Sequence, residues 1–187
     1  MSNLSNMFTD DFKISNPLKI AITGDGAVGK TSLCKFLTDG TIPSNYNLTV
    51  GCEIHSQKIP VNSNIKLPVI LWDMAGQERF ESVRSGFYRG TQGAVVVFDL
   101  TSRGSFYDIN NWVRELRRNV PNTPFVLVGN KADRQEREVS KAEAESLAKK
   151  LGVPYIETSA KDGVNVKDVF SQIAQLAATR DARSLAY

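Results

Sequence analysis

Cysteine and histidine are scarce in this chain of 187 residues, which contains two cysteines and one histidine. Two cysteines cannot form the disulfide framework that stabilises small secreted domains, so we expect Cys34 and Cys52 to be reduced thiols in a cytosolic protein. A lone histidine is more often structural than catalytic, and we assign His55 no role. The sequence therefore gives no support for a disulfide-rich scaffold or a histidine-based catalytic site.

Long hydrophobic runs and a strong charge of one sign are also lacking. No stretch approaches the roughly 20 apolar residues that cross a bilayer, and the polar, acidic segment from Met1 to Asn16 does not resemble a signal peptide. The 23 basic and 20 acidic side chains leave a net charge of +3, too weak and dispersed to indicate nucleic-acid binding. We therefore expect a soluble, cytoplasmic protein without a nucleic-acid partner.

Short apolar runs predict six strands in a chain long enough for one domain. Runs at 95–98 and 125–128 are continuous, which is typical of strands buried on both faces of a parallel sheet. The turn at 62–64 predicts an antiparallel hairpin between two of the strands. The predicted strands cover residues 18–23, 50–61, 65–72, 94–99, 125–129 and 154–158.

Helical periodicity occurs between these runs. Apolar residues recur at helical spacing from Phe106 to Val120. Ser140 and Glu143 form a capping box that predicts a helix through Leu151. A last helix is marked by Val166, Val169, Phe170, Ile173 and Leu176. Strands that alternate with helices indicate an α/β fold with a doubly wound sheet.

The segment from Gly24 to Thr31 reads GDGAVGKT and fits the pattern G-x-x-x-x-G-K-[ST]. It lies between a predicted strand and a predicted helix, so the glycine-rich backbone can direct N–H groups at phosphate oxygens. Lys30 can add a full positive charge, and Thr31 can offer a hydroxyl to Mg²⁺. Alone, the motif indicates a nucleoside triphosphate, because ATPases and nucleotide kinases share it.

Two later segments point to guanine. Asp133, in the sequence Asn130-Lys131-Ala132-Asp133, can accept hydrogen bonds from guanine N1–H and the 2-amino group, a pair of donors that adenine lacks. In the segment Glu157-Thr158-Ser159-Ala160-Lys161, the backbone N–H of Ala160 could donate to guanine O6. Each segment is weak alone, and each is more often a turn or a strand end.

Together these motifs, with Thr49 and the run WDMAGQE at 72–78, resemble in order and spacing the five nucleotide-binding motifs of the Ras superfamily of small GTPases. The run GQERFESVRSGFYRG at 76–90 resembles the Rab branch in particular. The resemblance implies a P-loop G domain whose six-stranded sheet has five parallel strands and helices on both faces. It divides the chain into an N-terminal extension (1–17), the G domain (18–179) and a short C-terminal tail (180–187).

The resemblance also implies residue roles. Gln77 would orient the water that attacks the γ-phosphate, and Thr31, Thr49 and Asp73 would hold Mg²⁺. Tyr46 could cover the phosphates. The nucleotide contacts would come from Asp25, Gly26, Ala27, Val28, Gly29, Lys30, Thr31, Ser32, Tyr46, Thr49, Gly76, Asn130, Lys131, Asp133, Ser159, Ala160 and Lys161.

A GTP-dependent switch follows from these roles, because Thr49 and Gly76 would contact a phosphate that hydrolysis removes. No arginine lies in the first switch loop, near residues 40–50, so we expect slow hydrolysis that an external activating protein accelerates. We expect Gly26→Val and Gln77→Leu to slow hydrolysis while GTP binding is kept. Exchange factors and effectors are the other expected partners, in trafficking or signalling.

Three positions differ from the family pattern. Ile54 replaces the usual phenylalanine of an apolar effector-reading triad with Trp72 and Phe87. Ile54 could equally belong to the core, whereas the resemblance favours effector contact for Trp72 and Phe87. Met74 stands at a usual threonine and should matter little, whereas Ile42 replaces an aromatic residue beside the guanine and should speed nucleotide exchange.

The C-terminus, Asp181 to Tyr187, has no cysteine for prenylation, and Met1-Ser2 does not fit N-myristoylation, so no covalent lipid anchor is evident. Any association with membranes would then depend on partners, unless a lipidated tail is missing from this sequence. Two other functions stay open at this stage. The chain could be a binding module with permanently bound nucleotide, or another P-loop enzyme such as an ATP-dependent kinase.

Overall fold

The computed structural model describes residues 16–42, 48–62, 64–77 and 80–184, with side chains through Arg180. Its centre is a six-stranded sheet with the strand order β2-β3-β1-β4-β5-β6. The strands are β1 (Leu18–Thr23), β2 (Cys52–Pro60), β3 (Lys66–Met74), β4 (Gly93–Asp99), β5 (Phe125–Asn130) and β6 (Tyr155–Glu157). β2 and β3 form the predicted antiparallel hairpin, and the other neighbouring pairs are parallel.

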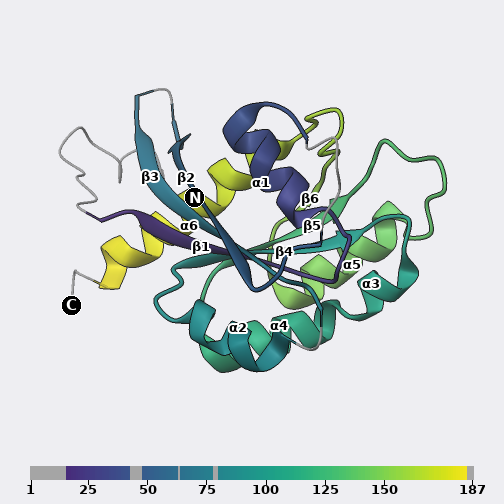
Figure 1. Cartoon of the computed structure of the whole chain (residues 1–187), viewed down its shortest axis with the longest axis horizontal. Coiled ribbons are helices and arrows are strands. Elements are labelled where there is room, and N and C mark those ends of the chain that lie inside the picture. Colours follow the sequence, from purple (N-terminus) through teal and green to yellow (C-terminus); the bar gives the residue numbers. More distant parts are fainter. Residues whose placement is uncertain (1–15, 43–47, 63, 78–79, 185–187) are drawn as a thin grey trace.

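The helices are α1 (Lys30–Asp39), α2 (Glu81–Tyr88), α3 (Arg103–Tyr107), α4 (Ile109–Asn119), α5 (Lys141–Leu151) and α6 (Val166–Ser184). They lie on both faces of the sheet (Figure 1), so the predicted doubly wound α/β fold is confirmed. The helix predicted through 106–120 is wrong in two respects, because the helical structure begins earlier, at Arg103, and is split into α3 and α4 at Asp108. Helix α2 was not predicted.

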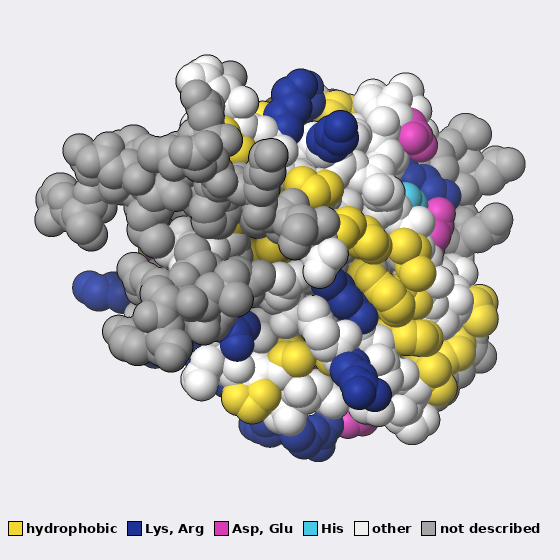
Figure 2. Space-filling view, turned by 90° about the vertical axis from the view of Figure 1, so that its left-hand side faces the viewer, with side chains coloured by type: hydrophobic (Ala, Val, Ile, Leu, Met, Phe, Trp, Pro, Cys, Tyr) yellow, Lys and Arg dark blue, Asp and Glu magenta, His cyan; other side chains and the backbone are white. Residues whose placement is uncertain are grey.

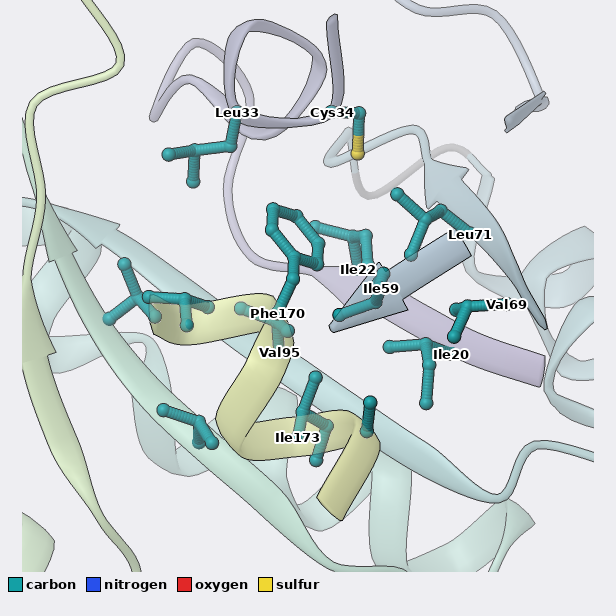
Figure 3. Packing of buried hydrophobic residues seen from close by; sticks show 14 of the residues in the cluster. Ile20, Ile22, Leu33, Cys34, Ile59, Val69, Leu71, Val95, Phe170 and Ile173 are labelled. Atoms are coloured by element: carbon teal, nitrogen blue, oxygen red, sulfur yellow. The ribbon is translucent and has the colours of Figure 1, made fainter. Parts of the chain in front are cut away.

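Two buried clusters hold the layers together. One lies between the sheet and helices α1 and α6, where Phe170 and Ile173 contact a surface that includes Ile20 and Leu71 (Figure 3). The other lies under α4 and α5 and includes Phe98 and Leu116. Strands β4 and β5 are buried along their whole length, since helices cover both of their faces.

Helix boundaries follow local chemistry. The Ser140 hydroxyl accepts a hydrogen bond from the Glu143 N–H, and the Glu143 side chain returns to the Ser140 backbone, so the predicted capping box of α5 is confirmed. Gly152 ends this helix in a left-handed conformation. The two cysteines are free thiols, and burial raises the pKa of both.

The parallel strands place the predicted motifs at one edge of the sheet. The segment after β1, the end of β3, the end of β5 and the segment after β6 all lie at the carboxyl edge, where open α/β sheets bind their ligands. Motifs more than 100 residues apart, such as Val28 and Asn130, are therefore neighbours. Tyr46 lies outside the described residues, so its predicted role has no structural counterpart here.

Candidate functional site

The phosphate loop connects β1 to α1 through three positions of positive φ, of which the first is Gly24, with φ 135°. Gly29, the residue before α1, has φ 99°, and Ala27 has φ 64°. A Cβ at Gly29 would lie 2.2 Å from the side-chain nitrogen of Asn130, so this position requires glycine for conformation and for space. The loop thus leads directly into the first turn of α1, where free N–H groups and the helix dipole favour an anion.

Lys30 begins α1 and is 6% exposed. Its ammonium donates hydrogen bonds to the carbonyl oxygens of Gly24 at 2.8 Å and Asp25 at 2.6 Å. Burial lowers its pKa to about 8, against the opposing effect of the Asp73 and Asp25 carboxylates. A buried cation of this kind is suited to an anionic partner, because a phosphate restores the favourable charge environment that burial removes.

The three predicted metal ligands come together from three separate segments. The Thr31 hydroxyl donates to Asp73 Oδ2 at 2.5 Å, and it lies 2.8 Å from the hydroxyl of Thr49. Asp73 is fully buried, and this burial raises its pKa, although the Thr31 hydrogen bond and the Lys30 charge act in the opposite direction. Two hydroxyls and a carboxylate are hard oxygen donors, so the residues present fit Mg²⁺.

A cavity of about 20 Å³ unites the phosphate loop with both switch segments. Its lining includes Lys30, Thr31, Thr49, Gly76 and Gln77. A Cβ at Gly76 would lie 2.3 Å from the Asp25 carbonyl carbon and 2.4 Å from Gly24 O, so only glycine allows this approach of the two backbones. At Gly26 a Cβ would lie 4.0 Å from Gln77 Cγ, so a methyl group fits and a larger side chain would meet Gln77.

Asn130, at the end of β5, joins the predicted base site to the phosphate loop. Its side-chain nitrogen donates to the carbonyl oxygen of Val28 at 2.9 Å. Its side-chain oxygen accepts from the Thr158 hydroxyl at 3.0 Å and from the Ala160 N–H at 3.2 Å. The Ala160 N–H, expected to face guanine O6, therefore already has a partner and would have to be shared with the base.

The other predicted base-site residues surround this buried junction. Asp133 accepts a hydrogen bond from the Ser159 hydroxyl at 2.7 Å, which orients the carboxylate expected to read the base. Lys131 has φ 68°, and its ammonium pairs with Asp99 Oδ2 at 2.5 Å. Lys161 is exposed, and Ser32 is half-buried in the first turn of α1. The structure thus groups the predicted residues of the described segments into a phosphate end and a base end.

Sequence reasoning missed a buried ion pair beside the phosphate end. The Arg84 guanidinium makes two hydrogen bonds of 2.8 Å to the Glu115 carboxylate, and the exposed fractions of the two residues are 3% and 8%. Arg84 also donates to the carbonyl oxygens of Ala75 and Gln77, at 3.1 and 2.8 Å. These two carbonyls flank Gly76, so α2 and α4 hold the second switch segment through Arg84.

Trp112 extends the same network to the phosphate loop. Its ring lies 4.5 Å beneath the Arg84 guanidinium, and its indole N–H donates to Asp25 Oδ1 at 2.5 Å. A cavity of about 500 Å³ opens beside these groups. No local sequence signal could have revealed this arrangement, since Arg84 and Glu115 are 31 positions apart and resemble ordinary surface charges in the sequence.

The predicted apolar triad lies on the outer part of the β2–β3 hairpin and on α2. Trp72 pairs in register with Ile54, which is 56% exposed, and the rings of Trp72 and Phe87 are 6.0 Å apart. The Lys19 ammonium lies 3.5 Å from the centre of the Trp72 ring. Figure 2 shows hydrophobic side chains in a band on one face, with Lys and Arg beside it. Ile54 is thus not an ordinary core residue.

Comparison with known proteins agrees with the nucleotide site described above. Residues 19–179 match the Ras family. The chain is 38% identical over 161 residues to the GTP-binding protein yptV2 of Volvox carteri, covering 84% of this chain and 74% of that protein. It is 37% identical over 173 residues to the Ras-related protein Rab7 of Drosophila melanogaster, covering 89% and 83% of the two chains.

A further relative is the Ras-related protein RABA5a of Arabidopsis thaliana, 40% identical over 172 residues, with coverage of 90% of this chain and 77% of that protein. The matched region contains both ends of the site described above, from the phosphate loop to the segment after β6. The chain therefore belongs to the Ras family and is a Rab-like small GTPase.

Proposed function

We propose that this chain is a slow, Mg²⁺-dependent GTPase switch in which Thr49 and Gly76 sense the γ-phosphate. One observation carries the proposal: the phosphate loop, Thr49 and the Gly76–Gln77 segment line a single cavity. A ligand group in that cavity would contact both switch segments, and its removal would release both. A binding module with permanently bound nucleotide would not need both Thr49 and Gln77 in the lining of the same cavity.

The side chains support hydrolysis by positioning. Lys30 and the N–H groups at the start of α1 would neutralise and orient the phosphates. Gln77, beside Gly26 at the cavity, would orient the attacking water. Bound Mg²⁺, held by Thr31, Thr49 and, through water, Asp73, would neutralise charge on the β- and γ-phosphates. At the base end, Asp133 and the Ala160 N–H would select guanine.

An arginine from another protein would complete the site. Residues 40–50 contain no arginine, and Arg84, the buried arginine beside the second switch segment, is held by Glu115 and two backbone carbonyls. Arg84 is therefore unable to supply the catalytic charge without breaking a buried ion pair. An activating protein that inserts an arginine would supply that charge.

Effectors would read the apolar triad of Ile54, Trp72 and Phe87 together with the switch segments. Ile54 is the partner of Trp72 across the β2–β3 ladder, and the rings of Trp72 and Phe87 are 6.0 Å apart. Along the chain, β2 begins shortly after Thr49 and β3 ends shortly before Gly76. Within the described residues, no helix is both long and apolar enough to span a bilayer. We propose a cytoplasmic protein, in trafficking or signalling, that reaches membranes through such partners.

Single-turnover hydrolysis tests the proposal. The protein is loaded with GTP, Mg²⁺ is added, and phosphate release is followed for hours. We expect a rate on the order of 10⁻⁴ to 10⁻³ s⁻¹, a range borrowed from the intrinsic hydrolysis of Ras, and a large decrease in Gln77→Leu with GTP retained. The matched control is Gln172→Leu, at an exposed position of α6. No release from the wild-type protein despite bound GTP would favour the nucleotide-locked module.

Competition with other nucleotides tests the base end separately. GDP and GTP should displace a fluorescent guanine nucleotide, and ATP should fail to do so at a large excess, because adenine lacks the donors that Asp133 would accept. Equal displacement by ATP would support the alternative of another P-loop enzyme.

A further inference from the structure

A second group of possible metal ligands lies behind the proposed Mg²⁺ site. Glu53, His55 and Asp73 each offer one ligand atom, and these three atoms lie within 4.8 Å of one another. Glu53 and Asp73 are direct partners across the β2–β3 ladder, and His55 follows on the same side of β2. All three lie on the face of the hairpin toward α1, where Lys35 contacts Glu53.

The cluster contains polar atoms that lack a protein partner. His55 Nε2 is buried and forms no hydrogen bond to any described residue, although it lies 3.7 Å from Glu53 Oε1. The His55 side chain is 10% exposed. Asp73 Oδ2 accepts from Thr31, whereas the buried Oδ1 has no partner among the described residues. A buried polar atom without a partner costs about 1–3 kcal/mol. The proposed Mg²⁺ site can account for Asp73 Oδ1, whereas His55 Nε2 lies outside that site and indicates a further ligand.

The negative charges of Glu53 and Asp73 give a second reason to expect a bound cation. Two carboxylates directly opposite each other on neighbouring strands repel, and burial of Asp73 increases this cost. Lys35 offsets part of it, with its ammonium 3.5 Å from Glu53 Oε1, but the Lys35 side chain is 31% exposed and can turn toward solvent. A divalent cation between Glu53 and Asp73 would balance both of these negative charges.

We propose that Glu53, His55 and Asp73 bind a divalent transition-metal ion of the Zn²⁺ class. Imidazole nitrogen favours such ions over Mg²⁺ and Ca²⁺, which prefer oxygen ligands. One histidine and two carboxylates supply three ligands of a four-coordinate site, and water can supply the fourth. The ion would connect β2 to β3 at the Glu53–Asp73 pair. Asp73 is also the residue that accepts the hydrogen bond from Thr31.

The test uses the full chain without a histidine tag, in excess Mg²⁺, with Zn²⁺ as the probe. His55 is the only histidine, so its imidazole resonances report the site directly. We expect one equivalent of Zn²⁺ to bind by calorimetry and to shift these resonances, and we expect the melting temperature to rise with Zn²⁺. His55→Gln should weaken Zn²⁺ binding at least about tenfold, since loss even of an outer-sphere partner has that effect.

Two further variants keep the test decisive. Glu53→Gln, at a half-exposed position that should tolerate the change, must also weaken Zn²⁺ binding, even if His55→Gln disturbs folding. Cys34→Ser and Cys52→Ser should each leave the affinity unchanged, because these two free thiols are the other groups near the cluster that could bind zinc, and Cys34 lies close enough to Asp73 and Glu53 for their charges to help raise its pKa. Unmoved His55 resonances in the wild-type protein, or affinity that depends on either cysteine rather than on Glu53 and His55, would overturn the proposal.

Discussion

The base end and the phosphate end of the site are built in different ways. At the base end, one buried neutral amide, that of Asn130, makes three hydrogen bonds to two separate segments, at Val28 and at Thr158–Ala160, so the protein itself connects these segments. At the phosphate end, Lys30 and Asp73 are buried ions whose pKa values are displaced by burial, and they come from different segments. A preformed base end can hold the nucleotide in either state, whereas a charged phosphate end responds to the number of phosphates.

The largest expected effect is on the free energy of unfolding, and it follows from the removal of Arg84, whose hydrogen bonds support the phosphate end of the site. Arg84→Met leaves Glu115 as a buried, unpaired carboxylate and should lower the free energy of unfolding by about 3–5 kcal/mol, measured by urea denaturation. The double variant Arg84→Met/Glu115→Met removes both charges and should recover much of this loss.

The double variant also separates stability from positioning. The Ala75 and Gln77 carbonyls still lack their donor in it, so single-turnover hydrolysis should remain slower than in the wild-type protein. Full recovery of hydrolysis together with stability would show that Arg84 supports the fold and does not position the second switch segment.

Breaking the base end should act on both nucleotide states alike. Asn130→Ala leaves Val28 O, the Thr158 hydroxyl and the Ala160 N–H without their partner, and at about 1–3 kcal/mol for each group the loss is about 3 kcal/mol or more. This loss falls on the free energy of unfolding, and we expect both GDP and GTP to dissociate faster by a similar factor, because the base end that both nucleotides would contact loses its support. Fluorescent nucleotides measure both rates.

The matched control is Asn110→Ala, at an exposed position of α4. Faster dissociation of GTP alone in Asn130→Ala would contradict the division into two ends, because the base is common to both nucleotides.

Gly76→Ala tests the phosphate end of the site, where GTP and GDP should be affected differently. The added methyl would force the Gly76 backbone away from Asp25 and Gly24, and the N–H proposed for the γ-phosphate would move with it. Loss of one such hydrogen bond, about 1–3 kcal/mol, corresponds to a decrease of about tenfold to a hundredfold in GTP affinity, while GDP affinity should change little.

Gly86→Ala is the control for this change, because nothing lies within 4 Å of a Cβ at that position of α2. Calorimetric titration of both nucleotides measures the ratio, and equal losses for GDP and GTP would contradict a γ-phosphate role for Gly76.

The smallest effect concerns an ion pair at the outer side of the base end. Hydrogen bonds from Arg137 lower the pKa of Glu157, so this pair stabilises the folded protein above the ordinary carboxyl value of 4.5 and loses its effect as the pH falls through the lowered folded value. Near neutral pH, Arg137→Gln should cost at most about 1 kcal/mol, or about 2–4 °C in melting temperature.

The difference between Arg137→Gln and wild type should diminish as the pH falls below 4.5, and Arg134→Gln, at an exposed position, is the control. A difference that stays constant with pH would assign the effect to the Arg137 hydrogen bond with the Val139 carbonyl instead.

The order and spacing of residues were sufficient to predict the main strands, the start of α5 and the class of nucleotide. The continuous apolar runs of β4 and β5 predicted strands buried on both faces. The Ser140 capping box predicted where α5 begins, because the two residues of the box lie at that helix start. The five motifs predicted the nucleotide class, because each depends on a few residues in a fixed local conformation. The split between α3 and α4 was missed, since helical periodicity continues across Asp108.

The sequence by itself determined the family, the α/β alternation and the identity of the phosphate and base motifs, since these properties reside in short segments and in their order. Only the tertiary structure decided which distant side chains meet. It placed Arg84 on Glu115, Asn130 between the phosphate loop and Ala160, and His55 beside Glu53 and Asp73. Such contacts depend on strand register and helix packing, and the spacing of residues along the chain carries no direct signal of either.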